Sequence, residues 1–165
     1  MFHGFILPGL ISVGRFNAVL LGLFCSLAAA LPAAAEDRYV PYSGIIHGTE
    51  GAEPVELRIR NETNRPMSCT ASLAHWYSDV IGTERPGGTL GVTLWHDPGT
   101  GVLNLMNTCD ARMPIEAIWC GRVEELHATR DRVALPFAAG PAPDVIERVC
   151  RDGPAGRLSC DGADG

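Results

Sequence analysis

The chain has 165 residues and a net charge of −6, and all 13 of its basic residues are arginine. This length suffices for one domain with its own hydrophobic core. The acidic balance argues against nucleic acid and against anionic membrane surfaces as partners.

The first 35 residues read as a secretory signal peptide. Their only formal charge is Arg15, which precedes the apolar segment 16–27, and small residues then lead to Ala33-Ala34-Ala35. A positive flank, an apolar core and a small-residue end are typical of a cleaved leader. We expect cleavage after Ala35, a periplasmic or secreted location, and no membrane association afterwards. An uncleaved anchor helix is the alternative, although the apolar core is short for a membrane span.

Five of the six cysteines follow the leader, and none forms a C-x-x-C motif. In an oxidising compartment such cysteines usually form disulfides. Cys150 and Cys160 flank a Gly/Pro-rich turn and are the first predicted pair, and Cys69 with Cys120 is the second. The fifth thiol is expected to stay free or to pair with another chain.

Alternating apolar and polar residues predict short strands through the middle of the chain. In the clearest case Val55, Leu57 and Ile59 point one way and the charged residues between them point the other. The predicted strands are 55–60, 68–77, 89–96, 102–108 and 114–121.

Two of these predicted strands depart from simple alternation. Near the end of 68–77, His75 and Tyr77 continue one face while Trp76 falls on the other, which indicates a bulge or a second covered face. The last strand, 114–121, is apolar on both faces, with Ile115, Ala117 and Trp119 on one and Ile118 and Cys120 on the other. That pattern is typical of a central or doubly covered strand.

The strand pattern predicts an all-β fold, a small immunoglobulin-like antiparallel β-sandwich over residues 36–135. The turn at Asn61 and the Pro86-Gly87 turn before an alternating strand resemble bacterial immunoglobulin-like modules, a likeness of architecture that implies no catalytic residues. Residues 136–165 are expected to form a Pro/Gly-rich, disulfide-tied tail. A short helix is predicted at Pro143–Cys150, because Pro stands at its start and Gly153 beyond its end.

The sequence Asn61-Glu62-Thr63 matches a glycosylation acceptor. In a chain with bacterial features, a structural turn asparagine is the preferred interpretation.

No catalytic or cofactor motif stands out. The chain has no nucleophile elbow, no cysteine-protease signature and no marked carboxylate pair. We therefore favour a non-catalytic exported module, without a cofactor, that binds a protein partner or serves as an accessory subunit. Its candidate binding residues lie opposite the main apolar set, where an exposed apolar patch would mark an interaction surface: Trp76, Trp95, Met106 and Ile118. The alternative, which we favour, is that a second sheet or the C-terminal segment covers that face.

Two other functions remain open. A copper-type metal site would use His75 and His96 with a soft ligand from Cys69 or from a methionine, namely Met67, Met106 or Met113. A small hydrolase or inhibitor would assemble its site from loops.

Overall fold

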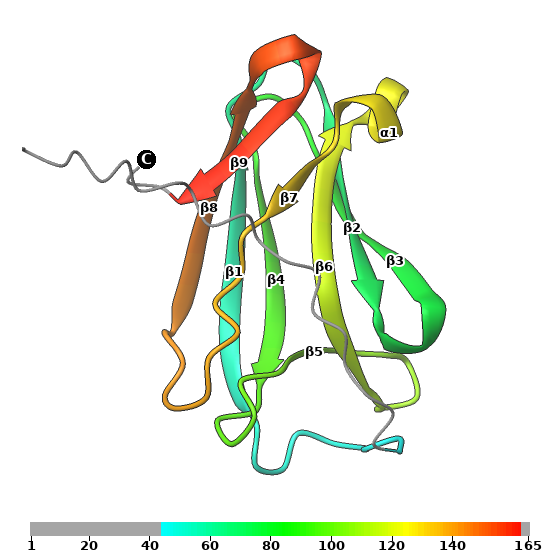
Figure 1. Ribbon diagram of the computed structural model, residues 1–165, viewed down its shortest axis with the longest axis vertical. Helices are drawn as coiled ribbons and strands as arrows, with labels where there is room; N and C mark the ends of the chain where they lie inside the picture. The colour runs from blue at the N-terminus through cyan, green and yellow to red at the C-terminus, as the bar shows by residue number, and fades with distance from the viewer. Residues whose placement is uncertain (1–43, 163–165) are drawn as a thin grey trace, which may run out of the picture. The chain divides into compact units, whose positions relative to one another are not determined.

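The computed structural model describes residues 44–162, so the predicted signal peptide and its cleavage site lie outside the described residues. The described part is mostly strand, and its nine strands form one mixed sheet (Figure 1). The strand order is β3-β2-β6-β5-β4-β1-β8-β9, with β7 paired to β6. The all-β prediction is confirmed.

The elements follow the chain in a regular order. The strands are β1 Glu53–Asn61, β2 Met67–Leu73, β3 Tyr77–Glu84, β4 Thr89–His96, β5 Leu103–Met106, β6 Arg112–Arg122, β7 Asp131–Val133, β8 Val145–Asp152 and β9 Leu158–Gly162. Short helical turns lie between some of them: η1 Ala74–Trp76, η2 Val123–Glu125, α1 Leu126–Thr129 and η3 Pro154–Gly156.

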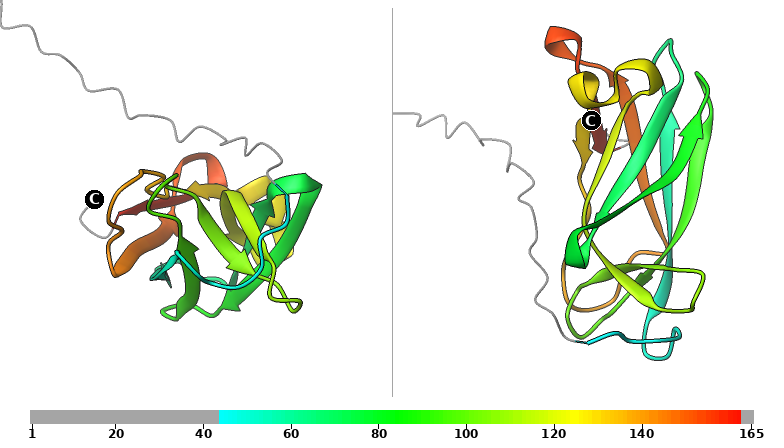
Figure 2. Two further views of the ribbon diagram at one scale, coloured as in Figure 1. Left: turned by 90° about the horizontal axis from the view of Figure 1, so that it is seen from below. Right: turned by 90° about the vertical axis from the view of Figure 1, so that its right-hand side faces the viewer.

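The sheet folds back on itself at β5. This short strand pairs with β4 on one side and with the start of β6 on the other. The half made of β3, β2, β6 and β7 thereby faces the half made of β4, β1, β8 and β9, as the view from below in Figure 2 shows. Strand β3 contacts β4, and β7 contacts β9. Both halves contribute to one core, which includes Leu57, Leu94 and Ile115.

Strand β1 is a central strand of its half, antiparallel to β4 and parallel to β8. Val55, Leu57 and Ile59 are buried, as their alternation predicts, and Arg58 and Arg60 are exposed. Burying each aliphatic side chain stabilises the fold by roughly 1.5–3 kcal/mol. This strand is therefore a main source of the core's stability.

The predicted strand 68–77 is wrong in its length. Strand β2 ends at Leu73, the chain turns through Ala74–Trp76, and β3 returns antiparallel from Tyr77. Both His75 and Trp76 adopt positive φ, at 68° and 69°. The lost alternation thus marks a hairpin turn, not a bulge inside one strand.

Strand β6 is central, as predicted, with β2 on one side and β5 and β7 on the other. Its register shifts where Ser72 pairs with Ala117 but Leu73 pairs with Ile115. Glu116 is the extra residue, so Ile115 and Ile118 both reach the core although they are three residues apart. The predicted grouping of Ile115 with Trp119 on one face is therefore wrong.

The helix predicted at Pro143–Cys150 is also wrong, because Val145–Asp152 forms strand β8. The prediction rests on Pro143 and Gly153 as helix boundary residues, and the apolar residues at 145, 146, 149 and 150 also have helical spacing. In the strand, Ile146 and Cys150 belong to the core cluster. Val149 is also buried, and it lines a surface pocket together with arginine side chains of β1 and β8.

Both predicted disulfides are present. Cys69–Cys120 joins β2 to β6, and Cys150–Cys160 joins β8 to β9. The sulfur atoms of Cys120, Cys150 and Cys160 lie within 4.8 Å of one another and are buried. The two disulfides, one from each half, thus pack together in the core, and Cys109 is left as an exposed free thiol.

Asn61 ends β1 and has no exposed surface. Its amide nitrogen donates to the carbonyl oxygens of Arg65 (2.9 Å) and Glu84 (3.0 Å). Its side-chain oxygen accepts from the backbone N–H (3.0 Å) and the hydroxyl (2.8 Å) of Thr63. These contacts confirm the interpretation of Asn61 as a turn asparagine.

Within residues 44–162, no helix has both the length and the apolar character needed to cross a bilayer.

Candidate functional site

A pocket of about 510 Å³ lies beside the β2–β3 hairpin, and we call it the tip pocket. Its volume is within the range of about 300–1,000 Å³ that is usual for ligand sites. Its walls come from the segment before β1, the hairpin, the end of β5 and the start of β6. The lining residues are Gly44, Ile45, Leu73, His75, Tyr77, Ser78, Asp79, Leu105, Met106, Asn107, Ala111, Arg112, Met113 and Pro114.

Exposed apolar side chains gather at the rim of the tip pocket. Trp76 is 102% exposed, Ile45 66%, Tyr77 62% and Ile46 48%, and we call these four residues the tip patch. Only two other large apolar side chains of residues 44–162 are exposed, Val80 and Val123. Four of the six exposed large apolar side chains of residues 44–162 therefore lie in two segments, Ile45-Ile46 and Trp76-Tyr77, which each contribute a residue to the tip pocket.

The backbone under the tip patch is strained. A left-handed conformation costs an L-residue roughly 1–2 kcal/mol, and only glycine or asparagine adopts it readily. Here two consecutive residues, His75 and Trp76, adopt it. Strain of this kind persists where the surroundings impose it and is concentrated at functional sites. The turn holds the indole ring of Trp76 entirely in solvent.

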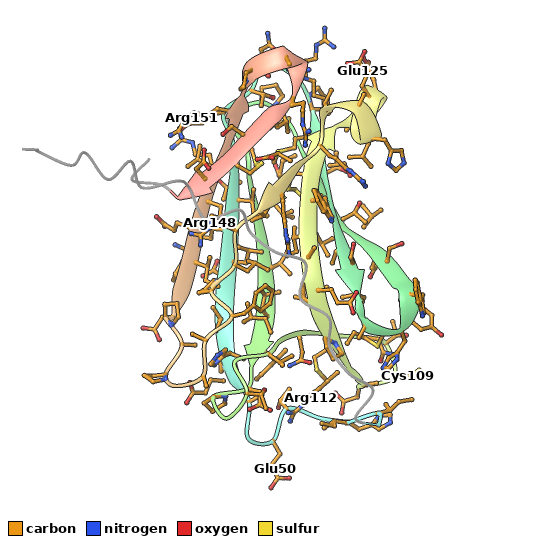
Figure 3. All side chains as sticks on the ribbon, in the orientation of Figure 1. Glu50, Cys109, Arg112, Glu125, Arg148 and Arg151 are labelled. Carbon is orange, nitrogen blue, oxygen red and sulfur yellow. A yellow bond between two sulfur atoms is a disulfide. The ribbon has the colours of Figure 1, made fainter. Side chains whose placement is uncertain are left out.

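One wall of the pocket is fixed by Arg112 at the start of β6. Its guanidinium donates to the carbonyl oxygens of Gly48 (2.6 Å) and Glu50. The backbone N–H of Arg112 also donates to the carbonyl of Ile46 at 2.8 Å. Figure 3 shows Arg112 and Glu50 at the end of the molecule where Cys109 also lies. These bonds hold the segment before β1 against β6, so that Ile45 stays beside the hairpin.

The structure does not bring the four predicted binding residues together. Trp76 stands at the rim and Met106 lines the tip pocket. Trp95 lies on β4, opposite Pro54 and Asn104, and is only half-buried. Ile118 is fully buried in the core. Simple alternation assigns these residues to one face, but the hairpin at His75 changes the direction of Trp76 and the bulge at Glu116 moves Ile118 to the core face.

The two histidines of the predicted metal site lie in different places. His75 lines the tip pocket, whereas His96 is 2% exposed at the end of β4. The Nε2 of His96 lies 3.0 Å from the carbonyl oxygen of Ala138, and so ties the segment after β7 to the sheet. His96 is not among the residues that line the tip pocket.

Among residues 44–162, one group of three or more His, Cys, Asp or Glu side chains lies close enough to share an ion. It consists of Cys120, Cys150 and Cys160, whose sulfur atoms are already engaged in disulfides.

The outer face of β1 and β8 has a different character, because arginine and glutamate side chains dominate it. Arg58 donates to both carboxylate oxygens of Glu56, at 2.9 and 2.7 Å, and its guanidinium lies 3.8 Å from Glu147. The hydrogen bond from Arg58 lowers the pKa of Glu56 and raises the pKa of Arg58. Arg151 and Arg60 likewise pair with Glu62. Arg148, which lines a pocket on the same face, donates to the carbonyl oxygens of Ala134 and Glu147 and pairs with no carboxylate there, so arginine is in excess on this face.

Four residues of the tip patch and the pocket wall were not among the candidates from the sequence: Ile45, Ile46, Tyr77 and Arg112. A signal was available in Ala74-His75-Trp76, which joins two strands without the glycine or asparagine that a tight hairpin prefers. Arg112 acts through contacts distant in sequence, which periodicity does not reveal. The chain matches no known family model, no curated protein and no solved structure.

Proposed function

We propose that this chain is an exported, non-catalytic β-domain that binds a protein partner through the tip patch, as a binding module or an accessory subunit. The observation that supports this most strongly is Trp76, fully exposed on a turn whose backbone is strained. Stability alone favours glycine or asparagine there and a polar surface. A binding role accounts both for the left-handed backbone at residues other than glycine or asparagine and for the exposed tryptophan.

The chemistry of the tip patch suits a protein partner. Tryptophan and tyrosine are enriched among the residues that dominate binding energy at protein interfaces. The tip pocket lies next to Trp76 and Tyr77, and its apolar floor of Leu105 and Met113 would accept a side chain from the partner. An aromatic anchor beside a recess is the arrangement that forms a well-packed interface centre.

The exported location rests on two features. The predicted leader over residues 1–35 is one, and the disulfides Cys69–Cys120 and Cys150–Cys160 are the other, because such bonds persist in oxidising compartments. Both support a periplasmic or secreted protein.

We also propose that the folded-back sheet is a variant of the immunoglobulin-like sandwich. The two facing halves over a common core support this. Two features differ from the antibody pattern, namely the parallel pairing of β1 with β8 and disulfides that join neighbouring strands.

The free thiol provides the experiment. Cys109 is exposed and lies in the loop between Asn107 and Ala111, which both line the tip pocket. A photo-crosslinker attached to Cys109 by maleimide chemistry, incubated with extract of the source cells, should capture one discrete protein. Trp76→Asn should abolish that crosslinked band.

Val123→Asn is the matched control, because Val123 is an exposed apolar residue just beyond the opposite end of β6. It should leave the band unchanged. Equal capture by the Trp76→Asn and wild-type chains, or no discrete band with either, would refute the proposed function.

A further inference from the structure

The two disulfides meet in the core, one from each half of the sheet. Cys69–Cys120 joins opposed residues of β2 and β6, and Cys150–Cys160 joins opposed residues of β8 and β9. The sulfur of Cys120 lies within 4.8 Å of the sulfurs of both Cys150 and Cys160, and Cys69 is not a member of this group. Cys120 is therefore the residue at which the two bonds meet.

An independent contact holds β9 at this place. Asp131 stands opposite Cys120 in the β6–β7 ladder, and its carboxylate accepts a hydrogen bond from the backbone N–H of Cys160 at 2.9 Å. Strand β7 also contacts β9. The fold thus holds Cys160 of one half beside Cys120 of the other.

This arrangement suits thiol–disulfide exchange. A thiolate attacks one sulfur of a disulfide, and the other sulfur leaves as the new thiolate. At 4.8 Å or less, a small movement brings two sulfur atoms into contact, and a fold that holds reacting groups together makes the step unimolecular and therefore fast. Because Cys120 is the near sulfur, a thiolate at Cys150 or Cys160 attacks Cys120 and displaces Cys69.

We propose that the two disulfides form an exchange pair, in which a dithiol reductant that opens one bond causes the other to move. The reductant becomes a disulfide, and Cys150 and Cys160 become thiols. The thiolate of one of them then forms a bond to Cys120, the Cys69–Cys120 bond breaks, and Cys69 leaves as a thiolate that takes up a proton. The disulfide that remains joins the two halves of the sheet instead of two neighbouring strands.

Cys150–Cys160 is the bond that a reductant reaches first. Cys160 lies on β9, a strand of five residues at the edge of the sheet that forms its ladder with β8. Cys69–Cys120 instead joins β2 to β6, and both of these strands are paired on either side. Elements with few pairing partners open more readily than central ones. The inference goes beyond partner binding at the tip patch and does not depend on it, because exchange takes place within the isolated chain.

The test creates the thiol by substitution, so it needs no reductant. Cys69→Ala leaves Cys120 as a thiol beside the intact Cys150–Cys160 bond, and the matched control Cys120→Ala leaves Cys69 as the thiol instead. Both chains also carry Cys109→Ser, so that the exposed thiol cannot take part. Each folded chain is incubated at about pH 8, where thiolate forms, and is then trapped with N-ethylmaleimide. Cleavage at arginine puts every disulfide cysteine on its own peptide, so mass spectrometry identifies each pairing.

In the Cys69→Ala chain we expect peptides that join Cys120 to Cys150 or to Cys160. They should be about tenfold or more as abundant as peptides that join Cys69 to β8 or β9 in the Cys120→Ala chain, because only Cys120 is held beside the second bond. Each chain lacks one disulfide, so circular dichroism must show that both are folded. In guanidinium chloride both thiols should exchange, because unfolding removes the difference in their positions.

A second measurement keeps all four core cysteines, and it decides the matter if Cys69→Ala does not fold. A limiting amount of a phosphine reductant, which cannot itself form a mixed disulfide, is added to the Cys109→Ser chain below its unfolding transition. We expect Cys69 to be trapped as a thiol and Cys120 to be bonded to Cys150 or Cys160.

Two results would overturn the proposal: native pairings alone in the folded Cys69→Ala chain or after partial reduction, and equal exchange by the folded Cys120→Ala chain. Capture of a partner at the tip patch without exchange would refute this inference and leave the proposed function standing, and exchange without capture would do the reverse.

Discussion

Replacing Asn61 by alanine tests how strongly one buried side chain holds the turn after β1. The side chain makes four hydrogen bonds, two donated to carbonyl oxygens of Arg65 and Glu84 and two accepted from Thr63. A net contribution of roughly 1 kcal/mol per bond gives about 4 kcal/mol for the four. The hydroxyl of Thr63 also reaches the carbonyl of Arg65 at 2.9 Å and keeps that bond, so the expected loss is about 3 kcal/mol.

For a domain of this size, a loss of this magnitude lowers the midpoint of thermal unfolding by about 10 °C. Urea unfolding should show the same loss with an unchanged slope. Asn64→Ala is the matched control, because Asn64 is exposed in the same turn, and such surface changes stay within roughly 0.5 kcal/mol. If Asn61→Ala and Asn64→Ala destabilised equally, the buried hydrogen bonds would not be the source of stability.

Two further predictions concern the disulfides and the outer face of β1. The loop closed by Cys69–Cys120 spans 51 residues and that closed by Cys150–Cys160 spans 10. Replacing the first pair by alanine should therefore cost about 1.4 kcal/mol more than replacing the second. Equal losses in chemical denaturation would contradict the loop-entropy argument. Arg58→Ala should raise the pKa of Glu56 toward its ordinary value, because the hydrogen bond that lowers it is removed. Because the pKa of Glu56 is lower in the folded state than in the unfolded state, this residue stabilises the fold above its unfolded-state pKa. That stabilisation is lost as the pH falls through the folded-state pKa. The free energy of unfolding of Arg58→Ala should therefore fall less on acidification than that of wild type. NMR titration of Glu56 measures the shift, and an unchanged pKa in the variant would disprove the role of Arg58.

Much of the sheet was predictable because single strands leave a local pattern. Strand β4 matches its predicted bounds, and the alternation of β1 identified its buried face. The disulfides were predictable for a related reason, since Cys69 and Cys120 fall within predicted strands and Cys150 and Cys160 flank a turn. The strand patterns and the Cys150–Cys160 pair are local signals, whereas Cys69 and Cys120 are 51 residues apart and only their places within predicted strands are local.

The errors arose where pairing between distant segments decides the structure. Strand β8 has helical spacing of its apolar residues, and it is a strand because it pairs with β1, about 90 residues earlier in the chain. The bulge at Glu116 is invisible to a period-two pattern, so the sequence assigns Ile118 to the face opposite the main apolar set and makes it a candidate binding residue, although it lies in the core.

The candidate site was predictable in part. Trp76, His75 and Met106 were identified by residue type, but their common location depends on the hairpin and on β5 meeting β6. Ile45 lies beside them because Arg112 binds the segment before β1. A sequence pattern does not encode that contact.

The most direct test of the account is to measure stability and partner capture together on Trp76→Asn. The indole is fully exposed, so little packing is lost, and asparagine adopts the left-handed conformation more readily. We predict an unfolding free energy higher by about 1 kcal/mol and loss of the protein crosslinked from Cys109. A variant that is less stable than wild type, or one that still captures the partner, would contradict the claim that this turn gives up stability in order to present a binding residue.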